Sequence, residues 1–237
     1  DRAGIGGQRV ISISYLGLTR EEPAPEGRAT GWRGWYDYFP WEDHRGGPPP
    51  FVEEIVQPSL RAWVKREASG RDERLQRAAI AFGFDGAPWN EELVLQRYEL
   101  LYEARLVPEA LRDHGLPEHG GAKASTIPGR PMEADHRRIL ATGMARLRAK
   151  IKYRPVVFEL MPPSFTLLQL QRTVEALGGR LVHKQNFRRL IEQQDLVEET
   201  GTTSFETGGR PAKLFRFRHA VFAERAVAGT KLPLSRS

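Results

Sequence analysis

The stretch that decides the fold lies at residues 165–192 and reads FTLLQLQRTVEALGGRLVHKQNFRRLIE. Thr166 can cap a helix, and Gln169, three residues later, completes a capping box. The apolar spacing then continues to the paired glycines Gly178 and Gly179, which readily end a helix in the left-handed conformation. The sequence therefore predicts a helix that begins at Thr166 and stops at a glycine corner.

A second helix is predicted over residues 183–192, directly after that corner. Phe187, Leu190 and Ile191 share one face at the i, i+3, i+4 spacing, so this face packs on the core. The remaining side chains must project away from the core. They are polar or charged and comprise Gln185, Arg188, Arg189 and Glu192.

Two short strands are predicted after these helices, at residues 196–200 and 212–218. Residues 201–210 between them are polar and contain glycine, which is typical of the loop of a hairpin. Helix, turn, basic helix and hairpin wing, in this order, are typical of a winged helix that binds DNA.

The charge of the chain is divided between its two halves. The formal net charge is +6, but residues 130–237 hold 20 basic and 10 acidic residues, whereas residues 1–129 hold 16 and 20. A basic half next to a mildly acidic half predicts one module for a polyanion and another for a different partner. The alternative is that the basic half is only a soluble face. The coincidence of the basic excess with the helix-turn-helix pattern favours the first interpretation.

Composition limits the remaining function classes. The 237 residues can bury a sizeable core, and no apolar run approaches the length of a membrane span. The chain has no cysteine, which excludes disulfides and thiolate chemistry and fits the cytoplasm. The six histidines are dispersed without metal-ligand spacing, so no metal site is predicted. The chain begins at Asp1, and we expect it to be a fragment.

The N-terminal half predicts one strand and several helices. Residues 9–18 alternate with the period of two that is typical of a sheet. A helical stretch is predicted over 51–82, with interruptions at Pro58 and Gly70, followed by a helix over 91–106. The sequence then predicts a loop at 112–131.

A long amphipathic helix is predicted from Asp135 to about Tyr153. Leu140, Met144, Leu147 and Ile151 form its apolar stripe. The basic residues expected around this stripe are Arg137, Arg138, Arg146, Arg148, Lys150 and Lys152.

Residues 132–218 resemble the C-terminal half of the Nudix-related transcriptional regulators, of which the bacterial repressor of NAD metabolism is the best-known type. The matching blocks are ADHRRI at 134–139, RLRAKI at 146–151, FTL at 165–167, LQ at 170–171, EA at 175–176, NFRR at 186–189, and GRPA at 209–212 leading into LFRF at 214–217. Residues 9–18 also look like the strand that follows the Nudix box in this family.

The resemblance implies an α+β protein with a Nudix-like α/β N-terminal domain, incomplete in this chain, and a winged helix-turn-helix domain. The expected sensor domain covers residues 1–153, with a mainly helical insertion at about 32–115 and a basic connecting helix at about 135–153. The winged helix is expected at 154–222, and residues 223–237 are expected to form a flexible tail.

The chain lacks the glutamate-rich Nudix box, whose carboxylates hold the magnesium that carries pyrophosphate cleavage. In the family this box would fall upstream of Asp1. No catalytic residue is therefore predicted, and we lean against an enzyme.

The expected DNA contacts come from the second helix and the wing. Arg188 and Arg189 can read guanine edges or bind phosphates, and Gln185 and Asn186 can pair with adenine. Asn186 can alternatively serve a turn or cap, and Arg210 can be a structural turn residue. The complete set of predicted DNA-binding residues is Lys184, Gln185, Asn186, Arg188, Arg189, Arg210 and Lys213.

A cluster of aromatic residues at 32–41 is the candidate wall of a ligand site. Aromatic faces can stack on a nucleobase, carboxylates can accept hydrogen bonds from ribose hydroxyls, and arginines can bind a phosphate. Large aromatics at irregular spacing also occur in a core or a dimer interface, and that alternative stays open. The candidate ligand-binding residues are Arg33, Trp35, Tyr36, Trp41, Glu42 and Arg45.

The sequence as a whole predicts a bacterial, cytoplasmic, ligand-responsive transcription regulator. No cofactor is certain, but a nucleotide-type effector such as ADP-ribose is expected, together with a homodimer that binds a palindromic double-stranded operator. Two alternatives stay open. One is a Nudix-type hydrolase of nucleoside diphosphate derivatives, with its catalytic box upstream of this chain, and the other is a protein-interaction module.

Overall fold

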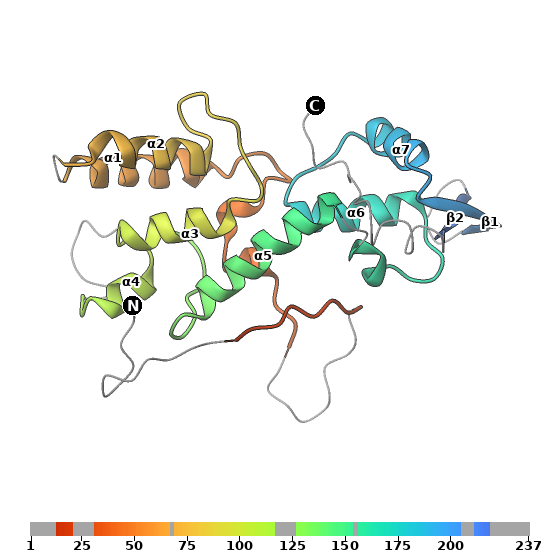
Figure 1. Ribbon diagram of the computed structural model, residues 1–237, viewed down its shortest axis with the longest axis horizontal. Coiled ribbons are helices and arrows are strands. Elements are labelled where there is room, and N and C mark those ends of the chain that lie inside the picture. Colours follow the sequence, from red (N-terminus) through yellow and green to blue (C-terminus); the bar gives the residue numbers. More distant parts are fainter. Residues whose placement is uncertain are drawn as a thin grey trace.

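The computed structural model describes residues 13–20, 31–66, 69–116, 127–153, 156–204 and 211–218. The elements fall into two groups joined by α5 (His136–Tyr153) (Figure 1). The first group contains η1 (Trp35–Asp37), η2 (Pro40–Glu42), η3 (Val52–Val56), α1 (Gln57–Lys65), α2 (Arg71–Phe82), α3 (Val94–Glu103) and α4 (Pro108–Asp113). The second contains η4 (Val156–Leu160), α6 (Leu167–Gly178), α7 (Lys184–Gln193), β1 (Val197–Ser204) and β2 (Ala212–Phe217).

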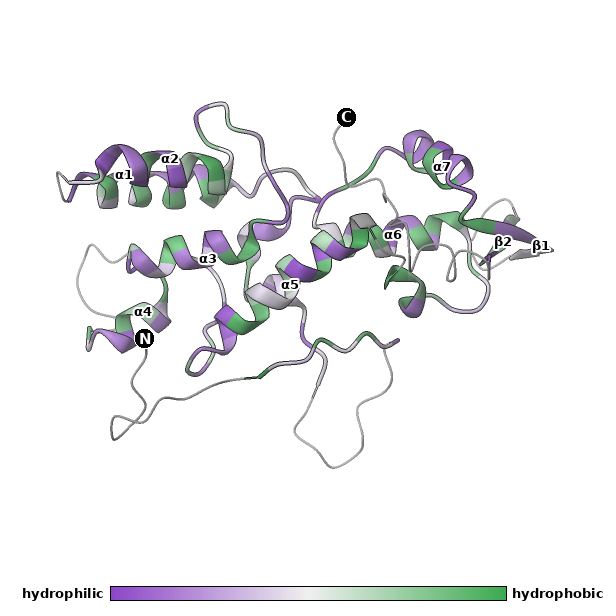
Figure 2. Cartoon of the chain, viewed as in Figure 1, coloured by the Kyte–Doolittle hydropathy of each residue, from purple (hydrophilic) through white to green (hydrophobic). Residues whose placement is uncertain are grey.

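The first group is a helical layer in which α1 and α2 form a hairpin that lies over α3 (Figure 1). The green bands of α1 and α2 in Figure 2 face α3, as expected of helices that bury one apolar stripe. The predicted break at Gly70 is confirmed, whereas the one predicted at Pro58 is wrong, because the helical backbone continues from η3 into α1 through Pro58. Pro58 lies in the first turn of α1, and Gly70, with φ of 69°, directly precedes α2.

Helix α5 belongs to both cores. Met144 packs in the core of the helical layer, whereas Leu147 and Ile151 pack in the core of the second group. The predicted apolar stripe is therefore confirmed, but the surrounding basic residues were only partly placed correctly. Arg137 and Arg148 are fully buried. These two arginines differ from the other basic residues expected around the stripe, because each donates hydrogen bonds to carboxylate and carbonyl oxygens of distant segments.

The second group is a winged helix with the predicted element order. The capping box of α6 is present, with the Gln169 amide donating to Thr166 Oγ1 at 3.2 Å and the Thr166 amide donating to Gln169 Oε1 at 2.7 Å. Gly179 ends α6 with φ of 72°. Phe165 exchanges two backbone hydrogen bonds with Phe215, so the chain entering α6 is attached to β2.

Strands β1 and β2 pair antiparallel, with an irregularity between Glu199 and Thr203. β1 extends to Ser204, so residues 201–204, which were predicted to belong to the wing loop, are part of the strand. The rest of that loop, including Arg210, lies outside the described residues, as does the expected tail at 223–237.

Mixed helix and sheet content confirms the α+β class, but strands within the described residues occur only in the winged helix. The strand predicted at 9–18 is wrong for residues 13–18, which are irregular and mostly exposed because no described strand lies beside them; residues 9–12 lie outside the described residues. Helix α3 begins at Val94 instead of residue 91, since the Glu92 amide donates to Asn90 Oδ1 in a turn. Helix α4 was not predicted and overlaps the start of the expected loop at 112–131.

Among the described helices, none combines the length and the apolar character needed to cross a membrane.

Candidate nucleic-acid interface

Helix α7 presents a polar face to solvent. Phe187 and Ile191 are buried against the core, which orients the opposite side of the helix outward. The five residues predicted to contact DNA from this helix are all exposed, namely Lys184, Gln185, Asn186, Arg188 and Arg189. Arg188 and Arg189 are both exposed, and a guanidinium group in this position can contact a phosphate or a base edge.

The alternative role for Asn186 as a cap is not seen. His183 occupies the N-cap position of α7 and makes no side-chain cap hydrogen bond, while Asn186 lies within the first turn. The open backbone amides at this end of α7 and the ammonium group of Lys184 both favour an anion.

The strands of the wing carry exposed ion pairs. Lys213 Nζ lies 2.8 Å from Glu199 Oε1, and Arg216 Nε lies 2.6 Å from Glu198 Oε1. Exposed pairs of this kind are weak, so a phosphate can replace the carboxylate at Lys213. Arg216 alternates with Phe215 and Phe217 along β2 and lies on the solvated face of that strand.

The corner between α6 and α7 is held by residues from the first group of helices. Arg148 Nε donates to Leu177 O at 3.0 Å, Tyr36 Oη donates to Ala176 O at 2.7 Å, and the His44 amide donates to Gly179 O at 2.6 Å. These bonds satisfy carbonyls at the end of α6 that the helix itself leaves without a partner. The orientation of α7 is thereby tied to segments that lie far away in the sequence.

Gly179 allows this close approach. A Cβ at this position would collide with Glu42 O, Arg148 Nη2 and Tyr36 Oη, and its φ of 72° disfavours any side chain. Gly201 has a similar φ of 79°, but a Cβ there would meet nothing within 4 Å.

Gly179→Ala is expected to lower the free energy of unfolding by about 2–5 kcal/mol, since it combines backbone strain with a collision in a packed corner. Gly201→Ala carries only the backbone strain and should cost about 1–2 kcal/mol. Urea unfolding of both variants measures the difference. Equal losses would show that the corner relaxes without cost.

A buried ionic cluster lies directly beneath this corner. The carboxylate of Glu42 accepts from Arg97 Nε at 2.5 Å and from Arg148 Nη1 at 2.6 Å, and all three side chains are 0% exposed. Arg97 also donates to Ala81 O and Asn90 O. Burial would by itself raise the pKa of Glu42, but the attraction of the two guanidinium groups and their hydrogen bonds lower it.

The residues predicted to bind a ligand are only partly brought together. Trp35 and Tyr36 are half-buried and in edge contact, and the Arg45 guanidinium lies 5.0 Å from the centre of the Tyr36 ring. Arg45 is also paired with Asp43 at 2.8 Å.

Trp41 and Glu42 lie in the core, whereas Arg33 is exposed. In this conformation Trp41 and Glu42 offer no surface to a ligand, because packing and the two arginines already occupy them. The core interpretation of the aromatic cluster therefore holds for Trp41 and for Phe39, which is also fully buried.

The buried arginines were missed from the sequence. Arg137 donates through Nε to Tyr38 O at 3.0 Å and pairs with Glu109 at 3.3 Å. A signal was present, because Arg137 and Arg148 fall on the same helical face as Leu140, Met144 and Ile151.

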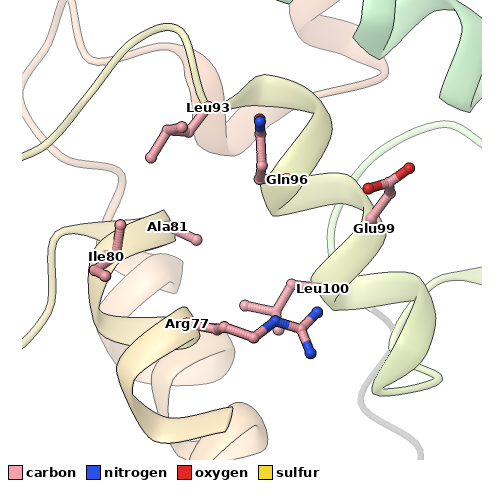
Figure 3. A pocket seen from close by; sticks show the side chains of 7 residues that line it. All are labelled: Arg77, Ile80, Ala81, Leu93, Gln96, Glu99 and Leu100. Carbon is pink, nitrogen blue, oxygen red and sulfur yellow. The ribbon is translucent and has the colours of Figure 1, made fainter. Parts of the chain in front are cut away.

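Two small cavities flank the helical layer. The first, of about 200 Å³, lies between α2 and α3, with Arg77, Ile80 and Ala81 facing Leu93, Gln96, Glu99 and Leu100 (Figure 3). The second, of about 230 Å³, is polar and is lined by Trp63, Arg66, Arg74, Glu103 and Arg105. Across the described ranges, no group of three or more potential metal ligands is assembled.

Comparison with known proteins identifies the C-terminal domain. Residues 157–217 match the family described as the NrtR DNA-binding winged helix domain. The C-terminal region is an NrtR-type winged helix. This confirms the resemblance to the Nudix-related regulators that the sequence predicts over residues 132–218.

A curated relative of this chain is the "ADPR responsive transcriptional repressor NtrR" of Acinetobacter baylyi, which is 41% identical over 83 residues. The match covers 35% of this chain and 33% of the relative, so the chain spans only about a third of that protein.

Two solved structures of Shewanella oneidensis NrtR also match. The structure complexed with a 27mer DNA is 33% identical with a TM-score of 0.35, covering 43% of this chain and 46% of the other. A second structure of that protein is 35% identical with a TM-score of 0.33, covering 42% and 44%.

Proposed function

We propose that this protein is a ligand-responsive transcriptional regulator that binds double-stranded DNA through its winged helix. The observation that carries the proposal is the outer face of α7, which is polar, basic and exposed within a domain whose family is described by DNA binding. Phe187 and Ile191 are buried on the opposite side of α7, so this face points outward. Such a regulator acts on DNA in the bacterial cytoplasm.

Different side chains of α7 are proposed to contact different parts of the DNA. Arg188 and Arg189 have the planar donor fork that matches guanine or a phosphate, and Gln185 and Asn186 match the edge of adenine. Lys184 lies at the start of the helix, where it suits a phosphate. Arg210 and Lys213 of the wing are proposed to contact the backbone or the minor groove.

A homodimer with two-fold symmetry would place two α7 helices in successive major grooves. The operator is then nearly palindromic, with half-sites about 10 base pairs apart or a multiple of that spacing.

The sensor in this proposal is the region up to residue 153, and the winged helix covers residues 154–222. The junction at Gly179 supports a link between them, since Tyr36, His44 and Arg148 all bind the corner that precedes α7. A ligand that moves these groups changes the orientation of α7 and thereby the affinity for DNA. The relative named for its response to ADPR supports a nucleotide-type effector such as ADP-ribose.

Selection from a random duplex library tests the DNA-binding proposal. The purified chain is expected to enrich a near-palindrome with the spacing given above, and footprinting should show protection on both half-sites. ADP-ribose added to the selected duplex should change its affinity for the protein. Enrichment of no sequence, with weak binding that salt abolishes, would contradict sequence-specific recognition.

A further inference from the structure

Two polar side chains of α6 are buried beside the chain that leads into α7. Gln171 is 9% exposed and Glu175 is 7% exposed, although both residue types normally lie at the surface. Gln171 Nε2 donates to Glu175 Oε1 at 2.9 Å. Because buried polar groups destabilise a protein unless they are hydrogen-bonded, the other partners of this pair show what the pair holds in place.

Both side chains bind the backbone of a single residue, Val182, which lies two positions before the start of α7. Glu175 Oε1 accepts from the Val182 amide at 3.0 Å, and Gln171 Nε2 donates to Val182 O at 3.1 Å. The apolar side chain of Val182 packs against the second core. Val182 is therefore held by its amide, its carbonyl and its side chain. We call Gln171 and Glu175 together the Val182 clamp.

Glu175 joins both sides of the corner between α6 and α7. Its backbone carbonyl accepts from the Gly179 amide at 2.9 Å, at the end of α6, and its carboxylate holds Val182. The backbone bonds of α7 begin only after Val182, where the Phe187 amide donates to His183 O at 2.9 Å. His183 is the N-cap of α7 and makes no side-chain cap hydrogen bond. The clamp, instead of a side-chain cap, therefore fixes how α7 leaves the corner.

We propose that Gln171 and Glu175 are positioning residues that set the sequence specificity of α7. Both are buried, so they act through the backbone of Val182 and not by touching DNA. The predicted base contacts, from Gln185 to Arg189, follow Val182 closely in the chain, so their placement depends on where α7 starts.

This role deepens the proposed function and rests on it. A recognition contact must be held to within about 0.5 Å of its productive geometry, and contacts to base edges carry the sequence information that phosphate contacts lack. A loosened start of α7 should therefore reduce discrimination between sequences more than it reduces binding to DNA in general.

The test compares the affinities of the full chain for the selected duplex and for a duplex with both half-sites scrambled, by fluorescence anisotropy at constant salt. In Glu175→Leu the Val182 amide loses its acceptor, and we expect the ratio of the two affinities to fall by about 10-fold or more. Affinity for the scrambled duplex should change by less than about 3-fold, since phosphate contacts dominate it. Glu175→Gln keeps an oxygen that accepts the bond and should retain most of the ratio.

Gln171→Met tests the other half of the clamp. It keeps the length of the side chain but removes the donor to Val182 O, so the ratio should fall as in Glu175→Leu. This variant also provides the measurement if Glu175→Leu does not fold.

Thr166→Ala is the control for a general loss of stability. It removes the capping box at the opposite end of α6, which lowers the free energy of unfolding without altering any bond to Val182. The ratio of affinities should be unchanged in this variant.

Hydrogen exchange of the Val182 amide, followed by NMR without DNA, reports on the clamp itself. Exchange should be slow in the unaltered protein and in Glu175→Gln, and about 10-fold faster or more in Glu175→Leu. Fast exchange in the unaltered protein would overturn the clamp.

An unchanged ratio in Glu175→Leu and Gln171→Met, or an equal fall in Thr166→Ala, would overturn the positioning role. If the unaltered protein does not distinguish the two duplexes while exchange at Val182 stays slow, the proposed function fails, and with it the role in specificity, whereas the clamp stands.

Discussion

Replacing Arg188 and Arg189 together by alanine is expected to weaken operator binding by about 100-fold or more, with little change in the free energy of unfolding. Each good bidentate contact to a base contributes about 1–3 kcal/mol, and phosphate contacts add a salt-dependent term. Both side chains are exposed, so their removal leaves no cavity. Fluorescence anisotropy with the selected duplex, at physiological salt, measures the loss.

The matched control is the double variant Arg61→Ala and Arg138→Ala. It removes the same two charges from exposed pairs with Asp85 and Asp135 in the helical part of the chain. Operator affinity should then fall only slightly, through long-range electrostatics. If both double variants lose affinity equally, the effect is one of net charge and α7 is not the reading helix.

Glu42→Gln is expected to destabilise the protein by about 3–5 kcal/mol. The substitution keeps the size of the side chain but leaves two buried guanidinium groups, those of Arg97 and Arg148, without their carboxylate. Urea unfolding measures the change. A loss below about 1 kcal/mol would mean that water or a rearrangement compensates the charges.

Glu199→Gln is the control, because it removes the same charge from an exposed pair with Lys213 and should cost less than about 1 kcal/mol. The effect at Glu42 also depends on pH. Since folding lowers the pKa of Glu42 from its ordinary value of 4.5, its stabilising contribution is complete above that value and is lost as the pH falls through the folded pKa. The difference between the unaltered protein and Glu42→Gln should therefore shrink on acidification.

The winged helix was predictable because its signals are local. The capping box joins residues three positions apart, the glycine corner depends on one backbone angle, and the polar face of α7 follows from the spacing of Phe187 and Ile191. Each signal acts within a single element, so short-range sequence rules describe it. The same reasoning found the stripe of α5, for which Met144 is an example.

Short-range sequence rules could not decide whether the strand expected at residues 9–18 would form. A strand is stabilised by its neighbours, and its alternation of side chains does not show whether a partner is present. The start of α3 was misplaced for a related reason, because the side chain of Asn90 forms a local turn that competes with the helix.

The order of elements in the DNA-binding domain and the outward direction of its basic side chains were set by the amino-acid sequence, because capping, glycine conformation and apolar spacing are properties of neighbouring residues. Only the tertiary structure decided that Glu42 binds Arg97 and Arg148, which lie 55 and 106 residues away, and that this cluster supports the corner before α7. Charged residues normally face water, and they are buried only where distant segments bring opposite charges into contact.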